Sequence, residues 1–398
     1  MFNFPIKSYD VVVCGAGPAG LKAAYEILQR SGGCYSVLLL DRKFPWKEPV
    51  ICAEAVSVKA FSKYWPVRQR FVRGNLSGVY FVAPNGAKAE FYKKDCALQL
   101  NRAELHRDMF EASEKLGVAY DFATKVSKLE RLDNGLWNVL VEKDGERATV
   151  TARVVVDSTG PGDKLTKHLP EFADIEDGKA DLEPAAFAIV EGVEHSREHI
   201  ELYFGSEFFG GYGWVFPRDG IEVNLGLVLG REALPEHSAR AALDKFLEKF
   251  PTAKIKGIYG GPIACGQSRK QVAKFGLFKA GDSASTVNPI SRSGIVEAIK
   301  SGYCTALSVL EWLAASDETG RAAAERAAFD RWFELQGKTH LRIAKAKKGF
   351  NSISDAKLNK AATKLSKYSR EESSIFKIFF TVLATSPSLI WKMRSFLK

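Results

Sequence analysis

Residues 9–41 read YDVVVCGAGPAGLKAAYEILQRSGGCYSVLLLD, and this stretch decides the fold. It opens with a short, β-branched apolar run that ends at Cys14, which is typical of a buried parallel strand. A glycine-rich turn follows, and residues 21–30 then repeat apolar side chains at helical spacing. A second apolar run ends in Asp41. The stretch predicts a strand–helix–strand unit, and the expected fold class is α/β with a doubly wound, Rossmann-like sheet.

The turn between the first strand and the helix has the pattern G-x-G-x-x-G at Gly15, Gly17 and Gly20. In this pattern the first glycine makes the tight turn, the second lets backbone N–H groups reach a pyrophosphate, and the third lets helix and strand pack closely. Asp41 follows 21 residues after Gly20, where a carboxylate would accept hydrogen bonds from a ribose. Because strand, helix and acid all lie at the expected places, we predict a dinucleotide site rather than a turn without function.

A second strand followed by a helix is predicted later in the chain. Residues 275–280 (FGLFKA) predict a buried strand that ends at Gly281-Asp282, and residues 295–313 have the pattern of a helix. A strand that ends in Gly-Asp before a helix N-terminus places a carboxylate beside free N–H groups. Such an element could hold the ribityl and flavin end of FAD. An ordinary strand–helix connection would give the same pattern.

Composition and charge limit the class of protein. The 398 residues are 46% hydrophobic and 26% charged, which describes an ordinary globular chain of two or three domains. Residues 331–398 hold 15 Lys/Arg and 4 Asp/Glu, whereas the rest of the chain holds 42 and 43. The net charge of +10 therefore belongs to a basic C-terminal part. This distribution argues against a nucleic-acid-binding body.

The cysteines and histidines point to no metal chemistry. The six cysteines are far apart, with no CxxC pair and no His/Cys cluster, so we expect neither a zinc site nor a disulfide scaffold. None of the six histidines has a metal-ligand or triad spacing. The N-terminus leads directly into a strand pattern without a signal-peptide layout. We therefore expect a cytoplasmic protein.

These motifs, in this order, resemble the geranylgeranyl reductase family of FAD-dependent enzymes, within the p-hydroxybenzoate-hydroxylase-like flavoproteins. The resemblance covers about residues 8–310. It is carried by GAGPAG at 15–20, PVICAE at 49–54, Arg102, YGWVFP at 212–217 and GDSASTVNPISRSGIVEAIKSG at 281–302. Tryptophan halogenases share the fold, but their WxWxIP string and catalytic lysine are absent. The resemblance implies a Rossmann-like FAD-binding domain with an antiparallel-sheet substrate domain.

The resemblance also implies an activity and a set of residues. The family reduces isolated double bonds of prenyl chains, and Cys52 is the implied catalytic residue. Tyr212 and Trp214 match aromatic residues of the prenyl pocket. The implied FAD-binding positions are Gly15, Gly17, Gly20, Asp41, Ala53, Arg102, Val126, Asp282, Gly294 and Ile295. No second G-x-G-x-x-G is present, so electrons would come from transiently docked NAD(P)H or from a small redox protein.

Chemistry gives Cys52 and the aromatic residues their expected roles. An isolated alkene has no carbonyl to polarise it, so a hydride must be matched by a proton from an acid. Cys52 is the candidate acid, and the alternative is a small buried hydrophobic residue. Burial of a prenyl chain contributes about 0.8 kcal/mol per CH₂. The residues that either wall such a pocket or form the core of a curved sheet are Phe208, Phe209, Tyr212, Trp214 and Phe216.

One residue departs from the family pattern. The family has P-x-x-G-x-G where this chain has Pro289-Ile290-Ser291-Arg292-Ser293-Gly294. Arg292 stands where a glycine would allow close approach of backbone to the isoalloxazine ring. We therefore expect the flavin geometry, or the charge near its N1 end, to differ from that of the family. The difference bears on substrate and reductant more than on FAD.

The expected domains are discontinuous. Residues 1–60, 97–170 and 265–312 form the FAD-binding domain, residues 61–96 and 171–264 form the substrate domain, and residues 313–398 form a basic helical region. Within the last region the uncharged run 378–391 is shorter than the ~20 residues that span a bilayer. With its basic and aromatic neighbours it predicts contact with an anionic membrane surface, or else a helical pair packed on the body.

Three functions remain as hypotheses. The first is an FAD-dependent reductase of prenyl double bonds, acting on a prenyl lipid or another isoprenoid. The second is a flavin-dependent monooxygenase that hydroxylates or epoxidises its substrate on the same fold. The third is a non-catalytic, membrane-associated flavoprotein. The combination of Cys-Ala-Glu at 52–54 and YGWVFP at 212–217 favours the reductase.

Overall fold

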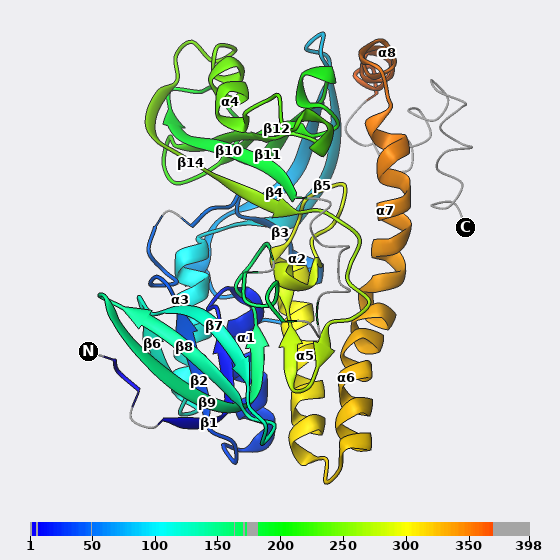
Figure 1. The fold of residues 1–398 in the computed structure, drawn as a ribbon. Coiled ribbons are helices and arrows are strands. Elements are labelled where there is room, and N and C mark those ends of the chain that lie inside the picture. The colour runs from blue at the N-terminus through cyan, green and yellow to red at the C-terminus, as the bar shows by residue number, and fades with distance from the viewer. Residues whose placement is uncertain are drawn as a thin grey trace. The chain divides into compact units, whose positions relative to one another are not determined.

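The computed structural model describes residues 2–4, 7–48, 50–162, 164–169, 172 and 182–368. The chain divides into two compact units, each built from three stretches of sequence (Figure 1). The first unit comprises residues 1–50, 102–182 and 264–341. The second unit comprises residues 51–101, 183–263 and 342–398.

The first unit contains the predicted Rossmann-like sheet, and the α/β fold class is confirmed. Its strands run in the order β15-β16-β9-β1-β2-β6, and β1 is parallel to both β2 and β9. Strands β7 and β8 extend β9 as an antiparallel ribbon. The strands are β1 (Ser8–Cys14), β2 (Val37–Asp41), β6 (Ala119–Phe122), β7 (Lys125–Arg131), β8 (Trp137–Lys143), β9 (Glu146–Asp157), β15 (Ala273–Lys274) and β16 (Leu277–Lys279).

Long helices complete the first unit (Figure 1). Helix α1 begins with a proline at its first position and is closed by Gly32 in the left-handed conformation, which explains where it starts and stops. A π-helical turn at Phe333–Gly337 joins α6 to α7. The helices are α1 (Pro18–Ser31), α3 (Arg102–Glu114), α5 (Ile295–Ala314), α6 (Glu318–Trp332) and the first turn of α7 (Lys338–Asn351), most of which belongs to the second unit; a 3₁₀ turn, η6, covers Gly281–Ala284.

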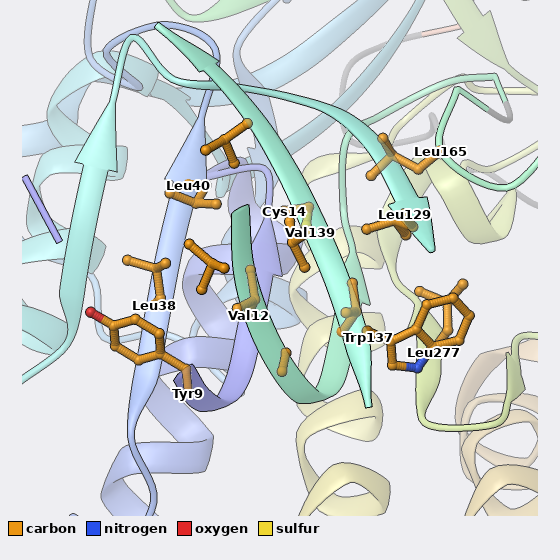
Figure 2. Packing of buried hydrophobic residues seen from close by; sticks show 14 of the residues in the cluster. Tyr9, Val12, Cys14, Leu38, Leu40, Leu129, Trp137, Val139, Leu165 and Leu277 are labelled. Carbon is orange, nitrogen blue, oxygen red and sulfur yellow. The ribbon is translucent and has the colours of Figure 1, made fainter. Parts of the chain in front are cut away.

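The core of the first unit lies where the β1–β2 layer meets the β7–β8 ribbon (Figure 2). Val12, Leu38 and Leu40 are fully buried, as expected for parallel strands that are covered on both faces. Trp137 packs beside Leu277, and its indole N–H donates to the Phe275 carbonyl at 2.9 Å. Strand β1, which contributes Val12 to this core, ends at the glycine-rich turn.

The second unit is built on one large sheet with the order β14-β10-β13-β12-β11-β4-β5-β3. From β10 to β3, neighbouring strands in this order are antiparallel except β11 and β4, which are parallel. Its strands are β3 (Ala55–Ser57), β4 (Val72–Val82), β5 (Lys88–Leu100), β10 (Leu182–Glu191), β11 (His199–Tyr203), β12 (Tyr212–Pro217), β13 (Val223–Val228) and β14 (Lys254–Ala264). Its helices are α2 (Val58–Phe61), α4 (Ala239–Leu247) and α8 (Asp355–Leu365), with the end of α7.

This sheet separates two apolar clusters, because side chains alternate between its faces. Val215 of β12 packs with Phe208, Leu243 and Phe246 on the face that α4 covers. Trp214 and Phe216 belong to the other cluster, with Phe187, Ile189 and Val228. Trp214 and Phe216, which are two residues apart in β12, therefore lie on the same face of the sheet.

Some expectations differ from the structure. Residues 275–280 do not form one strand, because Phe275 and Gly276 both have positive φ (53° and 77°) and turn β15 back onto β16. The first unit ends its first stretch at residue 50, so residues 51–60 lie in the second unit. Residues 313–398 are divided between the units at 341/342 rather than forming a region of their own.

The membrane-contact segment expected at 372–398 lies outside the described residues. Among the helices that the structure describes, none combines the length and the apolar character needed to cross a bilayer.

Candidate functional site

In the glycine-rich turn of the first unit, a side chain would collide with neighbouring atoms at two of the three glycines but not at the third. Gly15 has φ +106°, and a Cβ there would lie 2.3 Å from the Ser158 carbonyl oxygen. A Cβ on Gly20 would lie 1.9 Å from the Gly15 carbonyl oxygen. A Cβ on Gly17 would meet no atom within 4 Å. The first and third glycines are thus required by the protein's own packing, whereas the second faces open space at the start of α1.

Hydrogen bonds from neighbouring strands hold this turn. One Asp41 carboxylate oxygen accepts from the Ala16 N–H at 2.8 Å, and the other accepts from the Lys43 N–H at 3.0 Å. The Ser158 hydroxyl is within hydrogen-bond distance of the Cys14 and Gly15 carbonyl oxygens, at 3.0 and 2.8 Å. Asp41 therefore holds the glycine-rich turn directly through hydrogen bonds, a role that was not predicted from the sequence. Each carboxylate oxygen keeps a further lone pair for a ligand.

Helix α5 and the 3₁₀ turn η6 lie against the first turn of α1. A Cβ on Gly281 would come within 2.8 Å of the Ala19 methyl group, and one on Gly302 within 2.2 Å of the Ala19 carbonyl oxygen. The Gly281 N–H donates to the Ser301 hydroxyl at 3.0 Å. These close approaches bring the predicted residue Asp282 to the N-terminal end of α1.

Gly294 and Ile295 mark the start of α5, where Gly294 is the N-cap without a side-chain hydrogen bond. The first backbone N–H groups of a helix have no partner inside it, so this end can receive an electronegative group. Val126 lies in β7, two residues after Thr124, whose N–H donates to the Asp41 carbonyl oxygen at 2.8 Å. The structure therefore places this backbone close to the end of β2.

Arg102 begins α3 and is tied to a histidine that the sequence argument missed. Its guanidinium Nη2 lies 3.0 Å from His106 Nε2, and His106 Nδ1 lies 2.8 Å from the Pro45 carbonyl oxygen. Burial, then the charge of Arg102, lowers the pKa of His106 to about 3. The ring is therefore neutral, and the network assigns its proton to Nδ1, so Nε2 accepts from Arg102.

The same arginine affects the pKa of the Asp282 carboxyl. Burial raises its pKa from 3.8 to about 6, and the positive charge of Arg102 opposes this increase. The residue as a whole keeps some exposed surface, so the carboxyl is enclosed by its immediate neighbours rather than deep in the core. An enclosed carboxyl with a raised pKa is typical of a position that a polar ligand completes.

Arg292 takes the backbone conformation that suits a glycine. Its φ is +55°, and its N–H donates to the Asn288 carbonyl oxygen at 3.0 Å. The Asn288 side chain accepts from the N–H groups of Ile290 and Ser291, each at 3.0 Å, which closes the turn. The arginine side chain folds back and donates to the Ile290 carbonyl oxygen at 2.6 Å. Arg292 thus adopts the left-handed backbone conformation that suits a glycine at this position, and its side chain is buried.

Cys52 of the second unit lies in a loop that three residues fix. Its half-buried Sγ accepts from the Glu54 N–H at 3.3 Å. Its carbonyl oxygen accepts from Asn224 Nδ2 at 2.8 Å, while Asn224 Oδ1 accepts from the Trp214 indole at 2.8 Å. Gln99 Nε2 donates to the Ala53 carbonyl oxygen at 3.0 Å. Buried amides therefore hold the Cys52 backbone on both sides.

Glu54 anchors the other end of this loop. Its φ of +68° is uncommon for a residue with a side chain, and its buried carboxylate lies 3.3 Å from Arg218 Nε and 3.8 Å from Arg73 Nε. Arg73 also pairs with Asp219. An ion cluster thus maintains a strained backbone two residues after Cys52.

The aromatic residues divide between the two faces of the sheet. Trp214 and Phe216 are buried, Tyr212 is half-buried, and all three lie in the cluster against which Ala53 packs. Phe208 and Phe209 do not join them. Both pack in the α4-side cluster, and Phe209 stacks on His237 with ring centroids 4.3 Å apart. Of the two alternatives for Phe208 and Phe209, the core of the sheet therefore applies, because they follow β11 at a 3₁₀ turn and pack on the side opposite Trp214.

Comparison with known proteins shows which family the chain resembles. Residues 181–260 match the model of the geranylgeranyl reductase catalytic domain. A digeranylgeranylglycerophospholipid reductase of Methanosarcina acetivorans is 26% identical and is aligned over 98% of this chain and 96% of its own length. The chain is therefore similar to geranylgeranyl reductases along almost its whole length. It is accordingly an FAD-dependent oxidoreductase.

Solved structures show how the geranylgeranyl reductase fold relates to others. A geranylgeranyl bacteriochlorophyll reductase-like protein of Thermoplasma acidophilum has a TM-score of 0.85 at 20% identity, over 98% of this chain and 99% of that one. A p-nitrophenol 4-monooxygenase of Pseudomonas putida has a TM-score of 0.68 at 16% identity, over 98% and 99%. At these identities the likeness concerns the fold alone.

The residues of the first unit fit FAD, the cofactor of geranylgeranyl reductases. Gly17 opens onto free space at the N-terminal end of α1, where a pyrophosphate would accept from backbone N–H groups. Arg102 would add positive charge there, Asp41 would bond a ribose, and the enclosed Asp282 carboxyl would meet the ribityl end. Among the described residues, no group of His, Cys, Asp and Glu side chains is arranged to hold a metal ion.

Two further residues of this protein could have been recognised in the sequence. His106 stands four residues after Arg102 on a helix, which is the spacing of side-chain neighbours. Asn224 is a polar residue within the apolar strand VNLGLV, and a buried amide there must find partners. Neither signal says which residue is contacted, and this only the fold decides.

Proposed function

We propose that this protein reduces isolated carbon–carbon double bonds in the prenyl chains of geranylgeranyl-bearing glycerophospholipids, with Cys52 as the proton donor. The observation that carries the proposal is the Trp214–Asn224–Cys52 chain of hydrogen bonds, which ties the cysteine loop to the aromatic face of β12. The relatives that bear the name digeranylgeranylglycerophospholipid reductase support the same substrate class.

The chain's part in the reaction is to hold the alkene and deliver a proton. When bound and reduced, FAD supplies a hydride equivalent to one alkene carbon. The other carbon then needs a proton, and the Cys52 S–H bond breaks as the new C–H bond forms, which leaves a thiolate. The Glu54 N–H, which already points at Sγ, stabilises that thiolate. The thiol is restored by a proton from solvent.

The apolar face of the second sheet supports binding of a prenyl chain. Tyr212, Trp214 and Phe216 offer aromatic surface, and their neighbours in the cluster include small residues such as Ala53 and Ala55. Each buried CH₂ of the substrate contributes about 0.8 kcal/mol, so a long prenyl chain binds without many polar contacts. Tyr212, Trp214 and Phe216, which alternate along β12, thus support binding of the prenyl chain.

The electron donor and the source of the lipid complete the proposal. Electrons reach the flavin from transiently docked NAD(P)H or from a small redox protein. The protein collects its lipid at an anionic membrane surface, which the basic and aromatic composition of residues 372–398 supports. Removal of these residues should lower co-sedimentation with vesicles while FAD remains bound.

The test is an anaerobic turnover experiment. The purified flavoprotein is reduced with dithionite, a geranylgeranyl-bearing lipid is added, and products are followed by mass spectrometry. We expect stepwise addition of two hydrogens per double bond, with a large loss in Cys52→Ala. Cys96→Ala is the matched control, because Cys96 is another half-buried free thiol of the same unit. If the reduced flavin leaves the alkene unchanged but air then adds an oxygen to it, the protein is a monooxygenase instead.

A further inference from the structure

The last described helices carry a concentration of positive charge. Residues 342–368 contain eight Lys/Arg and a single acid, Asp355. All of these residues belong to the second unit and lie in α7 and α8 and the segments that join and follow them (Figure 1). Six of the eight cations are exposed: Arg342, Lys345, Lys348, Lys360, Lys364 and Lys367.

Within the residues that the structure describes, no acidic side chain pairs with these six cations. Lys347 shows the contrast, since its Nζ lies 2.8 Å from the Glu183 carboxylate, which is completely buried. Asp355 is engaged as well, because it accepts from the Ser206 N–H at 2.8 Å and from the Ser206 hydroxyl at 2.7 Å. In the part of the chain that the structure describes, none of the six exposed cations forms an ion pair. Their field is therefore directed at solvent.

The cations follow defined sides of the helices. On α8, Lys360 and Lys364 are four residues apart and so lie on one face, and Lys367 follows in the turn after the helix. The opposite face is buried and consists of Ala361, Ala362 and Leu365. On α7, the cations at 342, 345 and 348 are three residues apart and so run along one side.

Both helices are fixed to the second unit. The Asn85 N–H donates to the Asn359 side chain at 3.0 Å, which holds α8. Near the end of α7, the Phe350 ring packs edge-on against Phe204, with centroids 6.0 Å apart. The exposed cations are thus presented by anchored elements rather than by a loose tail.

We propose that these six cations form a binding surface for lipid bilayers that contain anionic lipids. Anionic headgroups complement six exposed cations whose one acidic neighbour in residues 342–368, Asp355, is bonded to Ser206, and each Lys or Arg that approaches the headgroups adds to affinity. The segment that follows in the sequence, 372–398, combines lysine and arginine with Phe379, Phe380 and Trp391, a composition typical of the interface of a membrane. This continuity favours a bilayer over an acidic protein. The inference rests on the proposed function only in that the substrate is a membrane lipid.

The test measures partitioning of the full-length, FAD-loaded protein onto vesicles without substrate or reductant. Vesicles of phosphatidylcholine with phosphatidylglycerol are compared with pure phosphatidylcholine. One variant carries Arg342→Gln, Lys345→Gln and Lys348→Gln, and a second carries Lys360→Gln, Lys364→Gln and Lys367→Gln. The control carries Lys63→Gln, Lys94→Gln and Lys254→Gln, which are exposed cations elsewhere in the same unit.

We expect each α7 or α8 variant to lower the partition coefficient on anionic vesicles on the order of 100-fold, and added salt to do the same to the parent protein. The control variant should bind as the parent does. If both variants retain FAD and bind anionic vesicles like the parent, the proposal is overturned. It is also overturned if they bind vesicles normally but lose reduction by an acidic redox protein, since the surface would then serve a protein partner. Turnover of a detergent-dispersed prenyl lipid tests the proposed function separately, because it needs no bilayer.

Discussion

The side-chain amide of Asn224 links Trp214 to Cys52: its oxygen accepts from the indole N–H at 2.8 Å, and its nitrogen donates to the Cys52 carbonyl oxygen at 2.8 Å. Asn224 is 1% exposed, so both bonds form away from water. A buried amide with both ends engaged can take only one orientation. Asn224 therefore sets the position of the cysteine relative to the aromatic face on which we propose that the prenyl chain binds.

We predict that Asn224→Asp lowers the rate of alkene reduction by at least about tenfold, because the carboxylate can still accept from Trp214 but can no longer donate to Cys52. Stability should fall by about 1–3 kcal/mol, since a polar contact in the interior is lost. Turnover and urea unfolding provide the measurements. Asn75→Asp, at an exposed position of β4, is the control. A variant that is less stable but turns over normally would mean that the amide holds the fold and not the cysteine.

A second prediction concerns His106. We expect His106→Phe to weaken FAD binding about tenfold or more, because the Arg102 guanidinium loses the acceptor that orients it. Since burial keeps the pKa of His106 at about 3, FAD affinity of the parent protein should not change with histidine protonation between about pH 5 and 8. Fluorescence titration of the apoprotein with FAD measures both.

His106→Gln separates positioning from packing. Glutamine can accept from Arg102 and donate to the Pro45 carbonyl oxygen, so it should recover part of the affinity that phenylalanine loses. Equal FAD affinity in all three proteins would show that the histidine does not act through Arg102.

Structural features that depend on residues close together in the sequence could be predicted. The first strand, the glycine turn and α1 were within reach because β-branched runs, a G-x-G-x-x-G turn and helical spacing act locally. The Asn224–Cys52 bond was not, because its residues are 172 positions apart and meet only after β12 and β13 pair. The face that Phe208 occupies depends likewise on a 3₁₀ turn between strands, where the two-residue alternation stops.

A third prediction tests the backbone of Arg292. We expect apoprotein with Arg292→Gly to be more stable than apoprotein with Arg292→Ala by about 1 kcal/mol, because a residue with a Cβ pays a steric cost at φ +55°. Both variants lack the guanidinium, so the comparison isolates the backbone. Urea unfolding gives the two free energies. Alanine equal to or better than glycine would show that the turn does not need the left-handed conformation in solution.

The last prediction is a pH dependence that arises from Asp282. Burial raises the pKa of its carboxyl from 3.8 to about 6 in the folded protein, so between these values the native state binds more protons than the unfolded state. Stability from this group therefore falls as pH rises through that window, by about 1–3 kcal/mol in total. Asp282→Asn removes the titration. The difference in unfolding free energy between variant and parent apoprotein should grow in favour of the variant from about pH 4 to about pH 6 and then level off. Because other carboxyls titrate in both proteins, they cancel in this difference, and a difference that stays constant over the window would contradict the enclosed position of the Asp282 carboxyl.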